Sequence, residues 1–460
     1  MKRKRPVALE DRSLLGRMLA NLGWLIGGKG FGAICSLVYL AILTRTLGLK
    51  DFGHFSLIFG TSQALIAVAG FQTWRVVVRF GAEHVHHKNW DAFGRLGMLA
   101  GVLDVCGALV GCAIAYLAFY QFADALGLNP ELVDLAFWFN VASLWALVSA
   151  PTGIVRALDR FDVAVYVEAV VPLGRLVAAV AIWLTEPTLA RFLIAWAAID
   201  ILEALIYWIM ARRLCPQSIR LSHLKDFTGA LNDNPGVIRF FIITFCSATL
   251  EATYRNGPLL AVGYLVGTRA AGLYRLAQQL AQGLAKLSTL LARAAYAEIA
   301  RARVASALDE FRKLIRQTSI LAGAGSAIVV LLVLVAGGLL LELLGGEQFA
   351  AGKPILIALV VGASFELASV AFEPMLDSTG RAKLSLTSRF LAVAATAVGI
   401  LAFAPSGGAQ GIAWGVALGG AVHYIAMGAM AWIVLRILVR NDRQEKAASA
   451  QADNGTKLEP

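Results

Sequence analysis

Ionisable side chains within long apolar stretches are the residues of this sequence best placed to do chemistry. A charge at the centre of a membrane helix costs about 2.5–3.5 kcal/mol, so it needs a partner or a wet cavity. The cations of this kind are Lys29, Arg175, Arg255, Arg275, Lys286 and Arg389. The acids include Asp104, Glu168, Asp200, Glu203, Glu251, Glu366, Glu373 and Asp377. We expect these side chains to face the protein interior.

One polar stripe repeats at helical spacing between residues 275 and 286. Arginine, two glutamines and lysine recur there at i, i+4, i+7 and i+11, which places them close to one helix face. Arginine and lysine are the side chains that phosphate recognition requires. The predicted cavity therefore suits an anion, and its candidate substrate-binding residues are Lys29, Arg175, Arg255, Arg275, Gln279, Gln282 and Lys286.

Several of the charges lie one or two helical turns apart on one stretch. Glu251 and Arg255 are i, i+4 neighbours and precede Asn256-Gly257-Pro258, a run expected to break or kink the helix. Pro374 predicts another kink, in the stretch that carries Glu366, Glu373 and Asp377. Glu168 and Arg175 lie two turns apart. For each such pair, the alternative to a functional role is a salt bridge that only holds the helices together.

Asp104 and His423 have no charged neighbour at such a spacing, and we expect them to be hydrogen-bonded core groups. The cluster around His84, His86 and His87 lacks a second group of ligands at a recognised spacing, so a solvated turn is favoured over a metal site. Gly28-Lys29-Gly30-Phe31-Gly32 follows no strand, which favours a closely packed helix over a phosphate loop. No metal or cofactor is predicted.

The amino-acid composition indicates the environment of the helices that must position these residues. Of the 460 residues, 58% are hydrophobic and 15% are charged, and the mean hydropathy is +0.69. Soluble domains need a more polar exterior, so lipid must be the main solvent. This excludes a soluble enzyme, a disordered scaffold and an ordinary nucleic-acid-binding protein, despite the net charge of +11.

Apolar windows long enough to cross a bilayer predict twelve membrane helices and an all-α polytopic membrane protein. The predicted spans are residues 20–44, 53–74, 96–120, 134–155, 162–185, 189–211, 237–262, 270–293, 317–343, 354–376, 384–404 and 410–436. With the N-terminus in the cytoplasm, 30 of the 41 Lys and Arg residues lie on the cytoplasmic side and 5 on the opposite side. This asymmetry predicts that both termini are cytoplasmic.

An internal repeat divides the spans into two sets of six. Residues 47–57 and 266–276 share the pattern apolar-Gly-x-basic-x-x-Gly-x-aromatic-x-Leu at an offset of 219 residues. Because an even number of spans separates the copies, the halves are parallel repeats, and two six-helix lobes are expected. The predicted parts are a basic N-terminus (1–19), an N-lobe (20–211), a cytoplasmic linker (212–236), a C-lobe (237–440) and a disordered cytoplasmic tail (441–460).

Three segments resemble a known family: Asn21-Leu-Gly-Trp24, Leu43-Thr-Arg45-Thr-Leu47-Gly48-Leu-Lys-Asp-Phe52-Gly53 and Gly272-Leu-Tyr274-Arg-Leu-Ala277. They resemble the polysaccharide-exporter branch of the multidrug/oligosaccharidyl-lipid/polysaccharide exporter superfamily, the bacterial flippases of O-antigen and exopolysaccharide units. The resemblance implies two lobes around a cationic cavity in the inner membrane. It also implies alternating access that moves undecaprenyl-pyrophosphate-linked oligosaccharide to the periplasmic leaflet.

The resemblance further implies coupling to a proton or sodium gradient, for which Glu251, Glu168 and Glu373 are the candidates. Its expected partners are the lipid-linked substrate, membrane lipid, and the polysaccharide polymerase and export machinery, with no nucleic acid. Two rival functions stay open. One is a multidrug or cation exporter of the same superfamily, against which the intramembrane cations weigh. The other is a membrane-embedded polymerase or glycosyltransferase, which would usually need a larger outer loop than this sequence offers.

Overall fold

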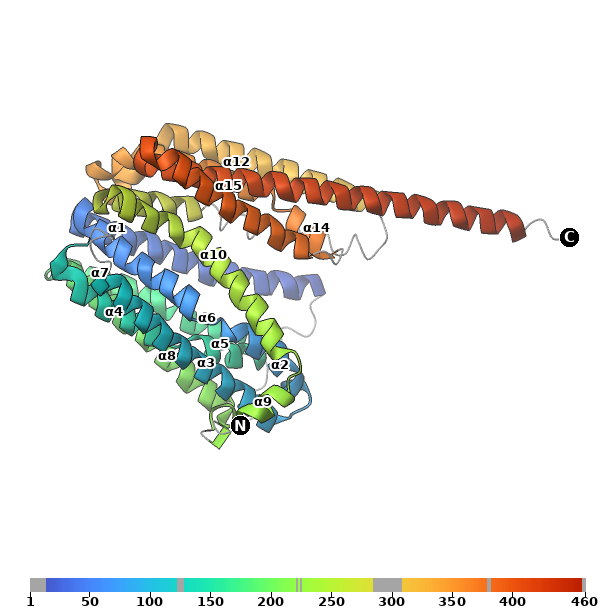
Figure 1. Cartoon of the computed structure of the whole chain (residues 1–460), viewed down its shortest axis with the longest axis horizontal. Helices are drawn as coiled ribbons and strands as arrows, with labels where there is room; N and C mark the ends of the chain where they lie inside the picture. Colours follow the sequence, from blue (N-terminus) through green and yellow to red (C-terminus); the bar gives the residue numbers. More distant parts are fainter. Residues whose placement is uncertain are drawn as a thin grey trace. The chain divides into compact units, whose positions relative to one another are not determined.

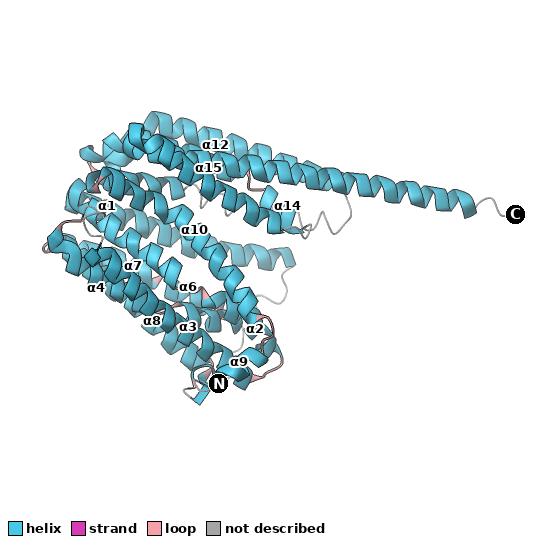
Figure 2. Ribbon diagram, viewed as in Figure 1, coloured by secondary structure: helices cyan, strands magenta, loops and turns pink. Residues whose placement is uncertain are grey.

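The computed structural model describes residues 14–121, 128–220, 222–223, 226–283, 308–378 and 382–456, and every regular element in these ranges is helical (Figures 1 and 2). The first unit holds α1 (Leu14–Ala69), α2 (Thr73–His86), α3 (Trp90–Tyr116), η2 (Leu117–Gln121), η4 (Pro130–Leu132), α4 (Val133–Trp145), α5 (Ser149–Ala157), α6 (Phe161–Glu168), α7 (Val170–Leu184), α8 (Leu189–Leu214), η5 (Pro216–Ile219) and α9 (Phe227–Asn232). After α10 (Val237–Val266) and a helix at 268–283 come α12 (Leu308–Gly345), η7 (Glu347–Gly352), α13 (Lys353–Ala368), α14 (Phe372–Ser378) and α15 (Ala382–Thr456).

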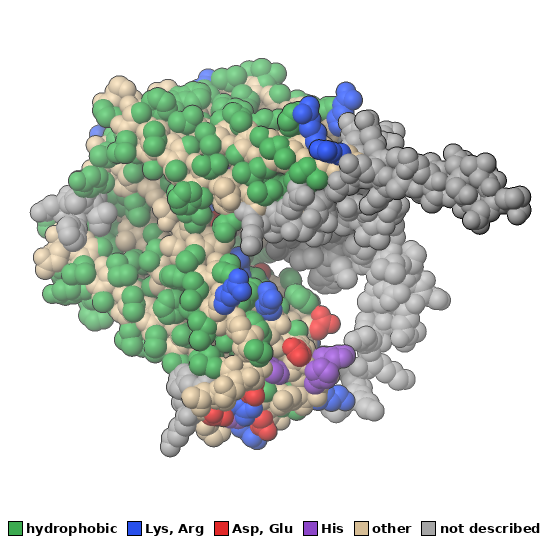
Figure 3. All heavy atoms as spheres, turned by 45° about the vertical axis from the view of Figure 1, so that its right-hand side comes forward, with side chains coloured by type: hydrophobic (Ala, Val, Ile, Leu, Met, Phe, Trp, Pro, Cys, Tyr) green, Lys and Arg blue, Asp and Glu red, His purple; other side chains and the backbone are tan. Residues whose placement is uncertain are grey.

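Two compact units divide the chain, residues 1–249 and 250–460, and the division falls within α10. The predicted lobe bounds, with their linker at 212–236, stay a prediction. Large apolar side chains cover much of the surface, as Figure 3 shows for one face. Val335 and Leu401, for example, are each 77% exposed. Such a surface is stable in lipid and not in water, which confirms the membrane assignment.

Nine helical segments of the described chain are long and apolar enough to cross a membrane. Leu384–Ile437 contains two predicted spans, and Phe31–Ala69 covers most of two others, because the described side chains of that helix begin at Phe31. Within each, one glycine leaves the helical region, Gly48 at φ 69° and Gly408 at φ 53°. The eighth predicted span, 270–293, continues beyond the described residues. The observed segments therefore agree with twelve predicted spans.

The internal repeat has a glycine with positive φ at the same position in both units. Gly48 and Gly267 occupy the same position in the motif, and both have positive φ, 69° and 104°. Glycine adopts this conformation without the steric penalty of a Cβ, and it lets one helix end and the next begin. The aromatic position is buried in both copies, and the final leucine is 1% or less exposed in each. The repeat therefore encodes one helix–turn–helix junction used twice.

Two interrupted helices in the first unit share one buried carboxylate. Residues 70–72 separate α1 from α2, and residues 146–148 separate α4 from α5. Asp104 of α3 is 4% exposed, and it accepts hydrogen bonds from the Thr73 hydroxyl (2.6 Å) and the Ala150 amide (2.7 Å). The prediction of a hydrogen-bonded core group at Asp104 is confirmed. Its charge also lies at the positive end of α5, where an anion is favoured.

The second unit also contains an interrupted helix, between α13 and α14. The break lies at residues 369–371, ahead of Pro374, which falls in the first turn of α14. Proline is tolerated there because the first amide groups of a helix have no internal partner. The kink predicted at Pro374 is therefore a break one turn earlier. In contrast, α10 continues through Pro258, so the helix does not break at Asn256-Gly257-Pro258, and the alternative of a kink there stays a prediction.

Helix also replaces disorder at the C-terminal end of the chain. The structure continues α15 to Thr456, through most of the tail that we predicted to be disordered. The tail is polar but rich in alanine, glutamate, glutamine and lysine, which have high helix propensity. A polar composition indicated a solvated segment, and it did not by itself exclude a helix that extends from an apolar span.

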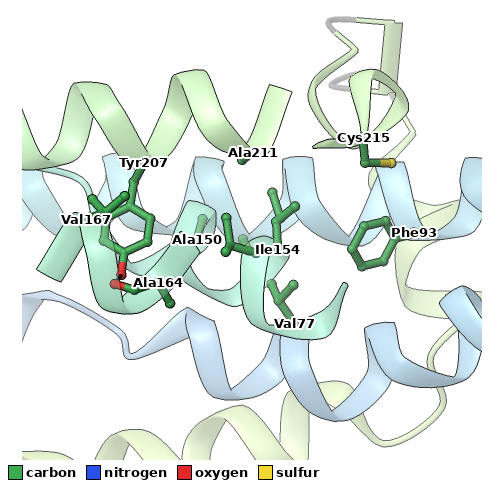
Figure 4. Close-up of a cluster of buried hydrophobic side chains, with 11 residues drawn as sticks. Val77, Phe93, Ala150, Ile154, Ala164, Val167, Tyr207, Ala211 and Cys215 are labelled. Atoms are coloured by element: carbon green, nitrogen blue, oxygen red, sulfur yellow. Dashed lines mark hydrogen bonds between the residues drawn. The ribbon is translucent and has the colours of Figure 1, made fainter. Parts of the chain in front are cut away.

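The core of the first unit packs α2, α3, α5 and α8 closely together (Figure 4). Val77, Phe93 and Ile154 are fully buried there, and Tyr207 donates a hydrogen bond to the Ala164 carbonyl. A Cβ on Gly153 would lie 2.8 Å from the Trp74 Cα. Only glycine therefore permits this approach of α5 to α2, which positions the side chains of both helices.

The segment predicted as a cytoplasmic linker is fastened to α2 and α3. Arg95 of α3 bonds Asp233 at 2.6 Å and lies 3.7 Å from Asp226, and these acids flank α9. The imidazole of His84 hydrogen-bonds to Asn234 at 2.9 Å. A long loop that is tied by several polar contacts has less freedom than its length implies.

Replacing Asp104 with alanine should lower the melting temperature of the purified protein. The Thr73 hydroxyl and the Ala150 amide would both lose their acceptor, and each unsatisfied buried group costs about 1–3 kcal/mol. Asp104→Asn keeps an acceptor oxygen, so its melting temperature should lie between those of the native protein and Asp104→Ala. Tryptophan fluorescence during heating in detergent measures the effect. An Asp104→Ala variant that melts with the native protein would disprove a structural role for this carboxylate.

Replacing Arg95 with alanine should expose the linker to protease. Loss of its two acidic partners would release α9, and trypsin should cleave more rapidly after the basic residues between 212 and 225. Arg160→Ala is the matched control, since it removes an exposed arginine whose described ion pair is with neighbouring Asp162. Equal cleavage rates in both variants would show that the Arg95 contacts do not hold the linker.

Candidate functional site

A group of charged side chains in the second unit converges on Arg389 of α15. Its guanidinium bonds Glu373 of α14 at 2.9 Å and lies 3.9 Å from the carboxylate of Glu251 on α10. Ser385 donates a further hydrogen bond to Glu373. The three charged side chains are 41–50% exposed. The structure therefore brings together two of the three acids predicted to take part in ion coupling.

Glu366 of α13 belongs to the same group and was not among the predicted site residues. Its carboxylate accepts a hydrogen bond from the Tyr254 hydroxyl, and Arg389, Arg255 and Glu251 all lie close enough to act on it electrostatically. Three carboxylates from three helices thus surround the cations. The i, i+7 spacing of Glu366 and Glu373 was the sequence signal for a shared face, although a break in the helix now separates them.

His423 lies beside this group and is hydrogen-bonded, as predicted. Its Nδ1 is 3.0 Å from the Ser388 hydroxyl, whose residue precedes Arg389. Ser388 also donates to the backbone carbonyl of His423. These contacts join the two halves of α15 that Gly408 separates, and they give the histidine a role in packing.

Arg255 and Arg275 are connected through a buried glutamine. The Arg275 guanidinium donates to the Gln278 side-chain oxygen (3.3 Å), and the Gln278 amide donates to the backbone carbonyl of Arg255 (2.8 Å). Gln278 is 6% exposed. The predicted stripe named its neighbour Gln279, which is half-buried like Gln282. Gln278 was missed, and its i+3 position relative to Arg275 was the signal available.

Arg175 and Glu168, in the first unit, each bond a different partner from the one predicted. Arg175 bonds Asp200 of α8 at 2.7 Å, and Glu168 bonds Arg156 of α5 at 2.6 Å. Glu168 and Arg175 therefore do not pair with each other, but each forms a salt bridge between helices, which was the structural alternative for these charges. Two turns of helix separate their backbones by about 10 Å, so neighbouring helices offer closer partners.

Aromatic rings also surround the guanidinium group of Arg175. Its guanidinium carbon lies 5.3 Å from the Phe59 ring centroid and 5.6 Å from that of Trp196. Arg175 and Asp200 thus form an ion pair flanked by two aromatic rings within the first unit. These contacts stabilise a positive charge that would be unfavourable in lipid hydrocarbon.

The structure describes no side-chain contacts for two of the cations predicted to bind substrate. Lys286 lies outside the described residues, and Lys29 lies in the part of α1 whose side chains the structure does not describe. Nearby, Gly32 lies against Pro172 of α7, 3.4 Å from where its Cβ would be. This contact confirms a closely packed helix in the glycine-rich segment, in place of a phosphate loop.

The amino-terminal 60% of the chain matches a known family. Residues 18–296 match the family described as polysaccharide biosynthesis protein. Inner membrane protein YghQ of Escherichia coli K12 is 26% identical over 342 residues, which span 72% of this chain and 93% of that protein. The share of both chains that is covered means that the similarity extends over most of the membrane-spanning region.

The fold is shared with solved transporters at low sequence identity. An inward-facing multidrug resistance MATE family transporter of the MOP superfamily superposes with a TM-score of 0.69 at 14% identity, over 89% of this chain and 96% of that one. The lipid II flippase MurJ, in an inward closed conformation, gives a TM-score of 0.68 at 11% identity, over 90% and 92%. At such identities the likeness concerns the fold.

Family membership, the apolar helices and the relative in the inner membrane agree with one another. The chain belongs to the polysaccharide biosynthesis protein family, as its resemblance to the polysaccharide exporters predicted; it is a multi-pass protein of the bacterial inner membrane and has the fold of transporters of the MOP superfamily.

Proposed function

We propose that the chain is a flippase that moves undecaprenyl-pyrophosphate-linked oligosaccharide repeat units across the inner membrane by alternating access. The units would serve O-antigen, capsule or exopolysaccharide biosynthesis. The family match over residues 18–296 carries the proposal, because it connects a transporter fold with polysaccharide biosynthesis. In this proposal the chain is a transporter and not an enzyme. A polysaccharide polymerase and export machinery would take up the product.

The proposed substrate contacts are the cations that the apolar spans contribute. Arg255 and Arg275 are the two described members in the second unit, and the Gln278 bridge supports a common role. A pyrophosphate carries several negative charges, and guanidinium groups bind phosphate oxygens through paired hydrogen bonds. Lys29, Lys286, Gln279 and Gln282 complete the proposed contacts. Arg175, already bonded to Asp200, is the weakest member of the predicted set.

We also propose that the acids around Arg389 couple transport to a proton or sodium gradient. Glu251 and Glu373 share this one guanidinium, so loss of either negative charge would change the other contact. Pro258 of α10 has no amide hydrogen, and the carbonyl of Tyr254 therefore lacks its usual helical donor. A helix weakened at this point, one turn from the Tyr254–Glu366 contact, is suited to bending. Glu168, bonded to Arg156, would act in the first unit.

The substitutions Arg255→Gln and Arg275→Gln should each reduce head-group translocation at least tenfold, since a hydrogen bond to a charged group contributes about 1.5–3 kcal/mol. Defined lipid-linked oligosaccharides in proteoliposomes provide the assay. Membrane insertion should remain normal. Arg191→Gln is the control, because this arginine pairs with Glu186 on the opposite side of the membrane in the predicted topology. Full activity in both test variants would exclude the proposed anion contacts.

The substitutions Glu251→Gln and Glu373→Gln should abolish the response of translocation to an imposed pH or sodium gradient. The neutral amides keep the shape of the side chains but cannot carry the charge that a cation neutralises. Glu186→Gln provides a charge-matched control. The coupling proposal fails if the variants respond to the gradients like the native protein.

The rival multidrug function is tested by the same preparations. An exporter of cationic drugs would confer resistance on a sensitive strain and would leave the lipid-linked oligosaccharide in its original leaflet. The cations near the second-unit acids oppose this function, because a positively charged drug would be repelled by Arg255 and Arg389.

A further inference from the structure

Arg75 and Arg79 of α2 form a pair of guanidinium groups without a described acidic partner. They are four residues apart, so they share one face of α2. Among the described residues, no carboxylate pairs with either one. The Nε of Arg75 is buried and has no hydrogen-bond partner in the described structure. Two like charges at this spacing repel each other, so they do not stabilise the helix.

Five other arginines of the first unit are paired with acids. Each bonds a carboxylate at 2.9 Å or less: Arg95, Arg156, Arg160, Arg175 and Arg191. The sequence therefore supplies acids where an arginine serves to hold helices together. Glu168, on the helix that follows α5, bonds Arg156 and leaves Arg75 without a described counter-charge.

Aromatic rings hold these guanidinium groups in place. The guanidinium carbons of Arg75 and Arg156 lie 5.4 Å and 4.8 Å from the centroid of the Trp74 ring. Arg79 lies 4.4 Å from the ring centroid of Phe240 on α10. Cation–π contacts orient an arginine while leaving its N–H groups able to donate to another molecule. Trp74 is itself fixed, because α5 approaches its backbone at Gly153.

The position of the pair along α2 indicates which molecule it meets. The break at residues 70–72 and the Asp104 contact lie just ahead of Arg75, and the chain then continues to the polar segment that contains His84 and Asn89. The predicted topology places this segment on the cytoplasmic side. Arg75 and Arg79 therefore lie where the apolar part of the second span gives way to water, the depth at which lipid phosphates are found.

We propose that Arg75 and Arg79 bind the phosphate oxygens of a membrane-anchored phosphate ester at the cytoplasmic interface. The phosphate belongs either to a polyprenyl diphosphate or to an anionic phospholipid, two molecules with the same binding chemistry. Trp74 and Phe240 orient the guanidinium groups. The residues of this site belong to the first unit, whereas Arg255 and Arg275 of the proposed function belong to the second, and ligand binding here does not require translocation.

The test measures binding to the full-length protein in nanodiscs of neutral phosphatidylcholine. Farnesyl diphosphate and a short-chain phosphatidylglycerol are the two probes, and farnesol is the uncharged comparison. Arg75→Gln with Arg79→Gln should weaken binding of at least one phosphate probe about 10- to 100-fold, as expected for lost charge-assisted hydrogen bonds. Farnesol binding should not change. The probe that is affected identifies the source of the phosphate.

The matched control is Arg160→Gln with Arg191→Gln, which removes the same net charge from two paired arginines. Phe240→Leu should weaken binding to a smaller extent through loss of the ring that orients Arg79, and it leaves the net charge intact. The proposal is overturned if the Arg75/Arg79 double variant binds both phosphate probes like the native protein, or if the control loses as much affinity. Translocation is scored separately, so a failed flippase assay leaves this result interpretable.

Discussion

The hydrocarbon core of a bilayer cannot donate or accept a hydrogen bond, so the protein must satisfy interrupted helices and charges at that depth from within. Asp104 illustrates the constraint most directly. Two helices of the first unit are interrupted, and the exposed ends of both would be unstable in an apolar core. One carboxylate bonds to the first turns of the two following helices. The paired contact of α2 with α5, and with it the placement of Trp74 and Arg156, depends on that arrangement.

The same constraint explains how charges are distributed in the first unit. Arg156, Arg160, Arg175 and Arg191 each bond one carboxylate, and most partners come from a neighbouring helix or turn. Such pairs hold helices in register, although a buried pair adds little net stability because both charges are desolvated. Arg75 and Arg79 are the contrast that this pattern makes visible. Aromatic rings orient the two guanidinium groups, but the two positive charges repel each other. No described carboxylate within the unit offsets that repulsion.

The second unit distributes its charges unequally. Arg389 is shared by Glu251 and Glu373, and Glu366 bonds a tyrosine instead of a cation. Several carboxylates around few guanidinium groups leave some of these acids without a cation of their own, which is the feature on which the proposed coupling to a cation rests. The two units therefore share a backbone repeat, seen at Gly48 and Gly267, while their buried chemistry differs. This asymmetry supports different roles for the halves in transport.

Local patterns in the sequence determined the all-helical fold, the spans and the repeat, because helix length and apolar composition are set by the bilayer within each segment. Gly48 and Gly267 could be predicted as equivalent for the same reason, since a turn is a local structure. Contacts between helices were decided only by the tertiary structure. Glu168 bonds Arg156 and not Arg175, and Glu366 joins Glu251 and Arg389. Gln278, which the predicted stripe did not include, connects Arg255 with Arg275. Spacing along one helix identifies a shared face, but the partner of a charge lies on another helix, and its distance depends on how the helices pack.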